Sequence, residues 1–259
     1  MPETKLNVKL LSHTVTPEIT IALGGRLCYS DSNIEDLREA AAPHADEFIG
    51  KLLSSSHLSP IEHASFTFGA EGVSRALLAQ ITRHRIASFS VQSQRYVRQE
   101  ELNYIIPESI KALGDEAVNE YKQQMAQIHS YYLSWLDKGI KAEDARFVLP
   151  NAAETRMVFT MNARELMHFF SLRCCNRAQW EIRRLAWIML AMARREAPAL
   201  FEKAGASCLS GACPEGRMCC KKQAQVKELS DFVTELAKNN TSDNELVKIL
   251  DFDRLNMNK

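Results

Sequence analysis

The chain has 259 residues, of which 46% are hydrophobic and 25% are charged, so it is long enough to bury one large core or two small ones. Lys plus Arg and Asp plus Glu balance at 32 each, which excludes a generally basic surface for polyanions. The longest apolar run, residues 185–193, is far shorter than the roughly 20 residues needed to cross a bilayer, so we expect no membrane span. The first residues contain no apolar signal segment, and we expect a cytoplasmic protein.

The first predicted elements alternate between strand and helix. Apolar and polar residues alternate over residues 6–10, which predicts a half-buried strand, and a helix follows from Glu18. Residues 34–56 have the pattern of two helical pieces, broken at Pro43 because proline removes an amide donor and restricts the residue before it. Alternation returns over residues 63–71, and this predicts a second strand.

The middle of the chain continues with helices and short strands. Leucines and isoleucine at helical spacing predict a helix within residues 73–85. A short strand is expected over 103–107, followed by a long amphipathic helix or helix pair over 108–138. The β-branched and apolar run 155–162 predicts another strand, and 163–173 a helix directly after it.

The last third of the chain changes composition after Cys220. Residues 179–196 are apolar around much of a helix, which predicts deep burial. Residues 221–259 are polar, with sparse helical spacing, and we interpret them as a helical C-terminal appendage to a single domain over residues 1–220. Helices alternate irregularly with few strands, so the predicted class is α/β, or more narrowly α+β.

A basic cluster lies between Arg83 and Arg98. It contains further arginines and His84, whereas no acidic residue occurs before Glu100. Adjacent guanidinium groups repel one another unless an anion lies among them, and arginine forks with serine hydroxyls are groups that bind phosphate. A solvated helix end or strand face with ordinary surface arginines is the alternative. Because the rest of the chain is neutral, a small phosphorylated metabolite or a nucleotide cofactor fits the cluster better than nucleic acid.

The phosphate-binding glycine motifs are absent, since neither GxGxxG nor GxxxxGK[ST] occurs in the chain. A phosphorylated ligand would therefore be held by side chains.

The cluster resembles the signature of the flavin-dependent thymidylate synthases, the ThyX family: Arg-His-Arg, seven residues, then serine, in "RHRIASFSVQS". Other blocks of that family have similar counterparts in the same order. Upstream these are "HLSPIEHASFTF" and "SRALLAQITRHR", and downstream "ARFVLP", "NAR" and "LRCCNRAQ". The resemblance extends from about Arg26 to Pro214.

The resemblance implies a methyltransferase that converts dUMP to dTMP for de novo dTTP biosynthesis. The carbon would come from 5,10-methylenetetrahydrofolate and the hydride from FAD reduced by NADPH. The implied fold is an α+β unit with a mixed or antiparallel sheet flanked by helices, assembled as a homotetramer with shared active sites. No nucleic acid or membrane partner is implied.

The resemblance also implies roles for individual residues. Arg173 would be catalytic, lying by the uracil, where a fixed cation can stabilise negative charge that develops on the ring. The implied dUMP-binding residues are Gln80, Arg83, Gln92, Ser93, Gln94, Arg95, Arg146 and Arg173. The implied FAD-binding residues are His57, Ser59, Arg83, His84, Arg85, Asn162, Arg164 and His168, among which Arg164 and His168 are four apart and share a helix face.

The chain departs from the family pattern at two positions. Val91 stands where many members have an acidic residue, and His168 stands where other members have asparagine.

Several of these residues have other interpretations. Ser93 near His84 could be a nucleophile, although no acid follows to orient the histidine. His57, His63 and His84 could suggest a zinc site. We do not expect one, because His57 and His63 lie at a probable strand entry and no third ligand follows them at a typical spacing. Arg146 and Arg173 could simply be arginines at helix ends.

Seven cysteines are an odd number and include two adjacent pairs, which does not suit a disulfide framework. Four of them, Cys208, Cys213, Cys219 and Cys220, are close in sequence, but their spacings of four and five residues fit a structural zinc site poorly. Reduced loop thiols are the favoured interpretation, and a metal or redox site is the alternative.

Two other classes of function stay open beside the thymidylate synthase. One is a non-catalytic nucleotide- or RNA-binding protein that uses the same arginines. The other is a different flavoenzyme that acts on another phosphorylated substrate.

Overall fold

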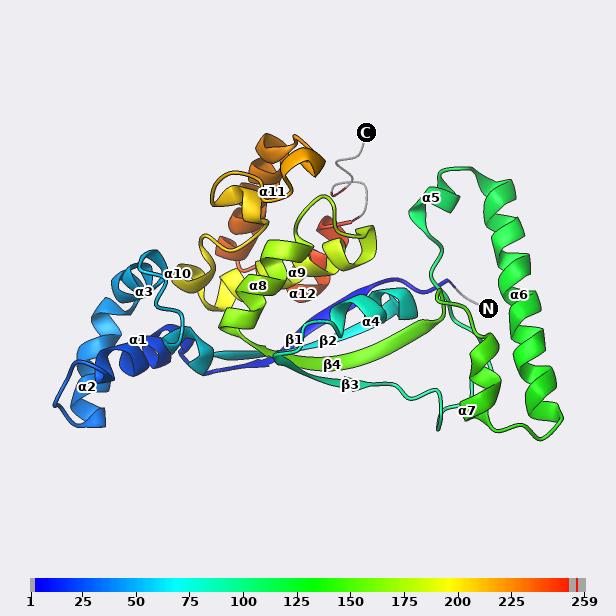
Figure 1. Cartoon of the computed structure of the whole chain (residues 1–259), viewed down its shortest axis with the longest axis horizontal. Coiled ribbons are helices and arrows are strands. Elements are labelled where there is room, and N and C mark those ends of the chain that lie inside the picture. The colour runs from blue at the N-terminus through cyan, green and yellow to red at the C-terminus, as the bar shows by residue number, and fades with distance from the viewer. Residues whose placement is uncertain (1–2, 252–254, 256–259) are drawn as a thin grey trace. The chain divides into compact units, whose positions relative to one another are not determined.

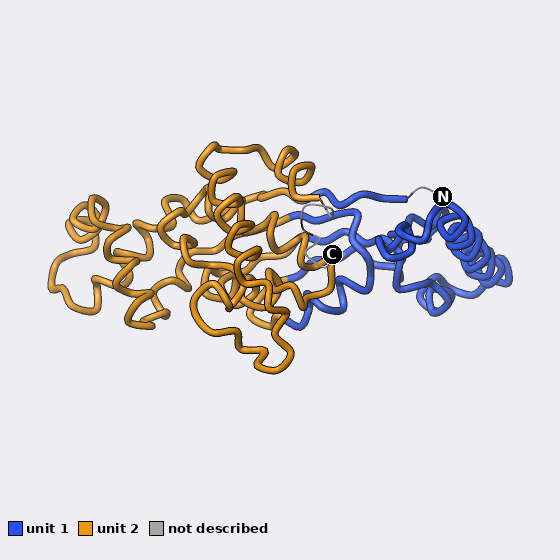
Figure 2. Tube along the Cα trace, turned by 90° about the horizontal axis from the view of Figure 1, so that it is seen from above, with its two compact units in different colours: residues 1–7, 69–83, 89–158 blue, residues 8–68, 84–88, 159–259 orange. Residues whose placement is uncertain are grey.

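A computed structural model describes residues 3–251 and residue 255 of the chain. The chain divides into two compact units, which Figure 2 colours separately. Unit 1 comprises residues 1–7, 69–83 and 89–158, and unit 2 comprises residues 8–68, 84–88 and 159–259. Within the described residues, no helix has both the length and the apolar composition needed to span a membrane.

Four strands form one antiparallel sheet with the order β1-β2-β4-β3 (Figure 1). They are β1 (Asn7–His13), β2 (Ser65–Ser74), β3 (Ala87–Val91) and β4 (Glu154–Asn162). The antiparallel direction of the first pair follows from its two ends: the amide of Thr14 donates to the carbonyl of Ser65, whereas Gly72 lies against the carbonyl of Lys5. The residue ranges of the two units divide each of the four strands, so the sheet belongs to both.

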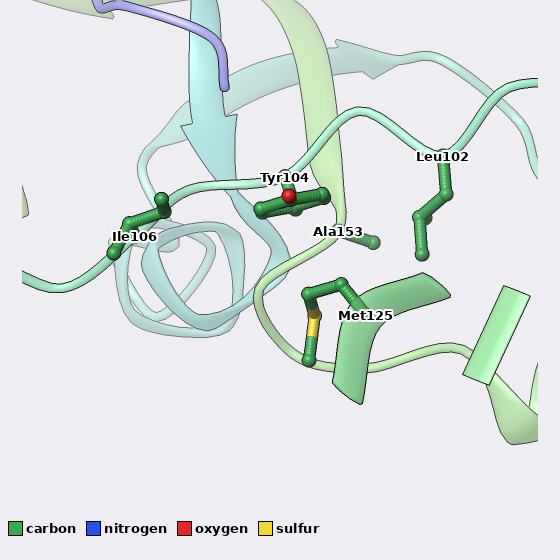
Figure 3. Close-up of a cluster of buried hydrophobic side chains, with 5 residues drawn as sticks. All are labelled: Leu102, Tyr104, Ile106, Met125 and Ala153. Atoms are coloured by element: carbon green, nitrogen blue, oxygen red, sulfur yellow. The ribbon is translucent and has the colours of Figure 1, made fainter. Parts of the chain in front are cut away.

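The helices of unit 1 are α4 (Arg75–Ile81), α5 (Glu108–Lys111), α6 (Asp115–Asp137), α7 (Ala142–Ala145) and the 3₁₀ turn Arg146–Val148. Helix α6 contacts α5, α7 and that 3₁₀ turn. Its Met125 is buried in a hydrophobic cluster with Leu102, Tyr104, Ile106 and Ala153 (Figure 3). Burial of these side chains therefore fixes the long α6 to the segment before α5 and to the start of β4.

Unit 2 is built around α9 (Trp180–Glu196), which packs against several other helices. These are α8 (Ala163–Arg173), α10 (Pro198–Phe201), α11 (Gln223–Lys238) and α12 (Asp243–Ile249). A second group packs around α1 (Pro17–Leu27), with α2 (Ile34–Ala41), α3 (Ala45–Ser54) and the 3₁₀ turns Ala42–His44 and Pro60–His63. Two further 3₁₀ turns, Ser207–Leu209 and Gly216–Met218, lie between α10 and α11.

The buried arginine Arg194 connects α9 to the elements that follow it. Its guanidinium donates to the carbonyls of Phe201, Ala204 and Ser230. Because a buried charge needs several partners to offset its lost hydration, these bonds fix the segment after α9 in one arrangement.

The structure confirms the predicted α+β class and the antiparallel sheet. The strands expected at 6–10, 63–71 and 155–162 are present, the chain breaks from α2 into a 3₁₀ turn at Pro43, and α9 is buried over most of its residues. The homotetramer stays a prediction, because the structure contains a single chain.

One predicted strand was wrong, and one strand was not predicted. Residues 103–107 do not form a strand, since Tyr104 makes only isolated bridges with Glu3 and Ala153. The apolar side chains there are used by the hydrophobic cluster instead of a ladder. The strand that was not predicted is β3, which lies inside the basic cluster. Its side chains alternate in exposure, but its serines and the neighbouring arginines do not give the apolar alternation that predicts a strand.

The domain prediction remains a prediction. Helix α11 and helix α12 of the predicted appendage 221–259 both contact α9. Residues 252–254 and 256–259 of that segment lie outside the described residues.

Candidate active site

The Arg-His-Arg sequence follows α4 directly. Ser74 begins this helix, because its Oγ accepts the amide of Leu77 at 3.0 Å. After the helix ends, Arg83 and Arg85 are exposed, whereas His84 between them is only 4% exposed. The three residues of the signature therefore divide into two accessible cations and one buried imidazole.

His84 lies in a chain of side-chain hydrogen bonds with Glu165 and Arg173. Its Nδ1 is 2.8 Å from Oε1 of Glu165, and Nε of Arg173 donates to its Nε2 at 3.1 Å. Because the guanidinium can only donate, Nε2 must be the accepting nitrogen, and the ring proton is on Nδ1, from which it is donated to Glu165. The carboxylate thus fixes the tautomer of His84, and His84 fixes the orientation of Arg173.

The electrostatics favour a neutral His84. Burial lowers the pKa of its imidazole below the ordinary value, the hydrogen bond to Glu165 opposes this, and the positive charge of Arg173 lowers it further. The rings of His168 and Phe169 lie edge-on to His84, with centroids 5.8 Å and 5.0 Å away. A neutral ring is the form that can accept a hydrogen bond from Arg173.

Helix α8 positions Glu165 and Arg173. Asn162 begins the helix, since its Oδ1 accepts the amide of Glu165 at 2.9 Å. The buried side of α8 carries Glu165 beside Leu166 and Phe169, so the carboxylate enters the core with an apolar face. Arg173 is the last residue of the helix.

Unit 2 contains most of the residues predicted to bind FAD, namely His57, Ser59, His84, Arg85, Asn162, Arg164 and His168. His57 and Ser59 lie between α3 and the next 3₁₀ turn, with His57 partly buried and Ser59 exposed. Arg164 and His168 are both exposed on α8, and Arg164 pairs with Glu62. Asn162 is occupied as the cap of α8, so its amide nitrogen is the part left for a ligand.

Unit 1 contains the residues predicted to bind dUMP other than Arg173, namely Gln80, Arg83, Gln92, Ser93, Gln94, Arg95 and Arg146. The amide of Gln92 donates to the carbonyl of Arg156 at the end of β3, and a turn follows. In this turn the Oγ of Ser93 accepts the amide of Arg95 at 3.1 Å.

Two arginines in unit 1 are partly paired. Although no acidic residue is near Arg95 in the basic cluster, its Nε lies 3.1 Å from Oε2 of Glu143. The acid comes from α7, which is why the local sequence did not reveal it. Arg146 donates from Nε to the carbonyl of Glu143 at 3.1 Å, in agreement with the alternative that it stabilises a helix end.

Unit 1 also contains buried donors that lack a partner within the described residues. Nε2 of Gln94 and Nε of Arg75 are buried and make no hydrogen bond there, although another nitrogen of Arg75 donates to the carbonyl of Gln92 at 2.9 Å. Burial lowers the pKa of Arg75, and the nearby charge of Arg146 lowers it further. Two close guanidiniums and an unpaired amide are an arrangement that an anion would stabilise.

The competing interpretations receive little support from this geometry. Nε2 of His84 accepts from Arg173 and is not free to take a proton from a serine, and the Oγ of Ser93 already accepts a backbone amide. Among the described residues, no three His, Cys, Asp or Glu side chains form a group that could hold a metal ion.

Sequence reasoning missed Glu165 and Arg75. Glu165 stands three residues after Asn162, the spacing of a helix N-terminus, and it interrupts the apolar face of α8. Arg75 lies inside the "SRALLAQITRHR" block, five residues before Gln80. The positions of Glu165 and Arg75 in the sequence could have drawn attention to them. Neither position indicates which side chain the carboxylate or the guanidinium contacts in the fold.

The chain is similar to known proteins over most of its length. The family described as "Thymidylate synthase complementing protein" (Thy1) matches residues 9–199. A flavin-dependent thymidylate synthase of Geobacter sulfurreducens is 51% identical over 86% of this chain and 97% of its own length. One from Clostridium tetani is 45% identical over 86% of this chain and 96% of its own.

A solved structure is similar as well. The crystal structure of a UMP/dUMP methylase, PolB from Streptomyces cacaoi, bound with 5-Br dUMP, has a TM-score of 0.67 and 25% identity, and the match covers 77% of this chain and 94% of that one. The family match and the similarity to relatives over almost their whole length lead to one conclusion: the chain belongs to the Thy1 family, that of the flavin-dependent thymidylate synthases.

Proposed function

We propose that the chain methylates dUMP to dTMP, with 5,10-methylenetetrahydrofolate as carbon donor and NADPH as the source of electrons for a bound FAD. The single observation that carries the proposal is the chain Glu165–His84–Arg173, which holds a guanidinium in a fixed orientation inside the residues of the family signature. Family membership supports the reaction type, and the geometry supports the roles of individual residues.

The nucleotide is proposed to bind to unit 1. Its phosphate needs several donors, and the turn after β3 provides them, with Arg75 and Arg146 close enough to repel each other and Gln94 presenting a buried, unpaired amide within the described part of the chain. Binding of a phosphate would satisfy these donors and remove the repulsion. Arg83, Ser93 and Arg95 complete the proposed set, together with Gln80 and Gln92.

The flavin is proposed to bind to unit 2. The exposed Arg85, Arg164 and His168 are suited to its pyrophosphate and its ring edges, and His57 and Ser59 offer polar groups on a separate loop. A bound reduced flavin supplies the hydride that the methylation requires. The protein's part is to hold the cofactor and to provide fixed charges around the substrate.

Arg173 is proposed to stabilise charge on the uracil ring. Its guanidinium is oriented through Nε by His84, and a guanidinium held in this way can donate hydrogen bonds toward a substrate oxygen. A cation fixed before the reaction needs no reorganisation when negative charge develops, and this is the usual origin of a large electrostatic contribution.

A homotetramer with shared active sites is part of the proposal. Large apolar side chains next to the proposed ligand residues are strongly exposed in the single chain, with Ile86 at 67%, Tyr96 at 81% and Phe147 at 83%. Exposed apolar groups of this kind are typical of surfaces that another subunit covers. The mass of the purified protein by light scattering measures this directly, and a monomer would contradict it.

The experiment that tests the function measures dTMP formation by the purified protein. The protein should carry a yellow flavin that NADPH bleaches, and dTMP should appear only when dUMP, methylenetetrahydrofolate and NADPH are all present. The variant Arg173→Ala should retain flavin absorbance and lose turnover. A colourless protein that FAD does not reconstitute would support a nucleotide- or RNA-binding function instead.

The similarity to PolB indicates a second substrate that should be assayed. PolB is described as a UMP/dUMP methylase, so UMP should be assayed beside dUMP. Turnover of UMP at a rate comparable with that of dUMP would place this chain with a broader group of pyrimidine nucleotide methylases.

A further inference from the structure

Five of the seven cysteines line one small cavity in unit 2. The cavity has a volume of about 190 Å³ and lies among the end of α8, the loop over residues 207–221 and the start of α11. The cysteines in its wall are Cys175, Cys208, Cys213, Cys219 and Cys220, all of them free thiols. Because the proposed reaction uses none of these thiols, their convergence calls for a separate explanation.

Cys213 and Cys219 are in direct contact inside this cluster. The side chains of Cys213 and Cys219 share a hydrogen bond, and the backbone amide of Lys221 donates to the sulfur of Cys219 at 3.3 Å. Lys221 has a φ of 59°, in the left-handed region that costs energy for a residue with a side chain. In this backbone conformation the amide of Lys221 donates to Cys219.

The two thiols differ in acidity. The amide of Lys221 and then the thiol of Cys213 lower the pKa of Cys219. The amide of Glu215 lowers the pKa of Cys213, but its hydrogen bond to Cys219, together with burial, raises it, and the net shift is upward. The pair therefore places a thiol of lowered pKa beside a thiol of raised pKa, and such a difference suits an attacking thiol beside a resolving one.

We propose that Cys213 and Cys219 form a reactive dithiol site that a hydroperoxide oxidises to a disulfide. The Cys219 thiolate attacks one peroxide oxygen, the O–O bond breaks, and the leaving oxygen takes a proton and departs as water, or as an alcohol from an organic peroxide. The sulfur of Cys213 then displaces the hydroxyl of the resulting sulfenic acid, and its proton leaves with that hydroxyl as a second molecule, water. The peroxide is reduced by two electrons, and the two thiols are oxidised.

The surroundings favour this pair over Cys174 and Cys208. Cys174 is fully buried, and burial raises the pKa of its thiol far above the ordinary range. Burial also raises the pKa of Cys208. Cys28 is exposed but lies outside the cavity, so it serves as the matched control.

Peptide mapping of the full-length protein tests the proposal. The reduced protein is freed of reductant, treated with equimolar hydrogen peroxide at neutral pH, blocked with N-ethylmaleimide and digested. We expect a linked Cys213–Cys219 peptide pair and an intact mass lower by two hydrogen atoms, with the same result in Cys28→Ser. Cys213→Ser should stop at a sulfenic acid on Cys219 that dimedone traps, and Cys219→Ser should slow oxidation by at least about tenfold, since the thiolate is the reacting species.

Three results would overturn the proposal. The first is a wild-type protein whose Cys213 and Cys219 both remain alkylated after peroxide. The second is a disulfide that joins other members of the cluster. The third is a stoichiometric metal, released on denaturation, that masks these thiols in the purified protein. Because the wild-type map alone decides between these results, a variant that fails to fold does not weaken the test.

Discussion

Glu165 should act on catalysis through Arg173, because it orients His84, to which Arg173 donates a hydrogen bond. Replacing it by glutamine retains the shape and an oxygen acceptor, but an amide can also present a donor toward His84. With alanine, the Nδ1 proton of His84 loses its acceptor in a site where His84 is 4% and Glu165 6% exposed. In both variants the preference for the tautomer that accepts from Arg173 weakens, and with it the fixed orientation of the guanidinium.

The magnitudes follow from the 2.8 Å hydrogen bond between His84 and Glu165. A hydrogen bond to a charged group contributes about 1.5–3 kcal/mol, so Glu165→Ala should lower the free energy of unfolding by about 2–3 kcal/mol. If a loss of about 2.7 kcal/mol reaches the transition state, kcat falls about 100-fold, since each 1.36 kcal/mol is a factor of ten. Glu165→Gln keeps a neutral hydrogen bond and should lower kcat about tenfold.

The assay measures kcat and KM for dUMP together with urea unfolding. Leu166→Ala is the matched control, because Leu166 is the next buried residue of α8 and takes no part in the hydrogen bonds of His84. Its loss leaves a cavity that costs about 2–5 kcal/mol. At a temperature where all variants are folded, Leu166→Ala should retain kcat. The glutamine variant should recover part of the activity that the alanine variant loses.

Two results would contradict the proposed role of Glu165. If Glu165→Ala unfolds as easily as expected but turns over at the wild-type rate, the carboxylate only supports the core. If Leu166→Ala loses as much kcat as Glu165→Ala, general loosening of α8 explains the effect.

Three further predictions concern titration, ligand binding and backbone strain. Because burial lowers the pKa of His84, its contribution to stability is fully present above the unfolded value of about 6.5 and is lost as the pH falls from there through the lowered pKa, with a slope of up to about 1.4 kcal/mol per pH unit. Urea melts of His84→Asn between about pH 7 and pH 5 should lack that part of the slope, and an unchanged slope would assign it to other groups. Gln94→Met removes the unpaired buried Nε2, so stability should change by no more than about 0.5 kcal/mol or rise, while KM for dUMP increases about tenfold; a loss of stability with unaltered KM would argue for a structural role. Gly72 has a φ of 67°, and a Cβ there would overlap the carbonyl oxygen of Lys5, so Gly72→Ala should cost more than about 3 kcal/mol in denaturant melts. Gly50→Ala, in open space on α3, is the control and should be neutral or stabilising.

Local pattern was enough for most of the fold. Alternation over β1, β2 and β4 reports which side chains face the core, because successive residues of a strand point to opposite faces. Pro43 ended α2 through its own covalent structure. The pattern failed at Tyr104, where apolar residues fill a cluster instead of pairing in a ladder, and at β3, where the strand carries polar residues on accessible positions.

The basic cluster and its neighbouring blocks identified the family from sequence alone, because a reaction on phosphorylated ligands demands particular side chains at particular spacings. The sequence could not decide which partner each charge would meet. The carboxylate that orients His84 is 81 positions away, and the arginine that His84 orients is 89 positions away. Glu143, which pairs with Arg95, comes from a separate helix. Hydrogen bonds act over about 3 Å in space whatever the separation along the chain, so only the folded arrangement of α8 against the signature decided the tautomer of His84 and the direction of Arg173.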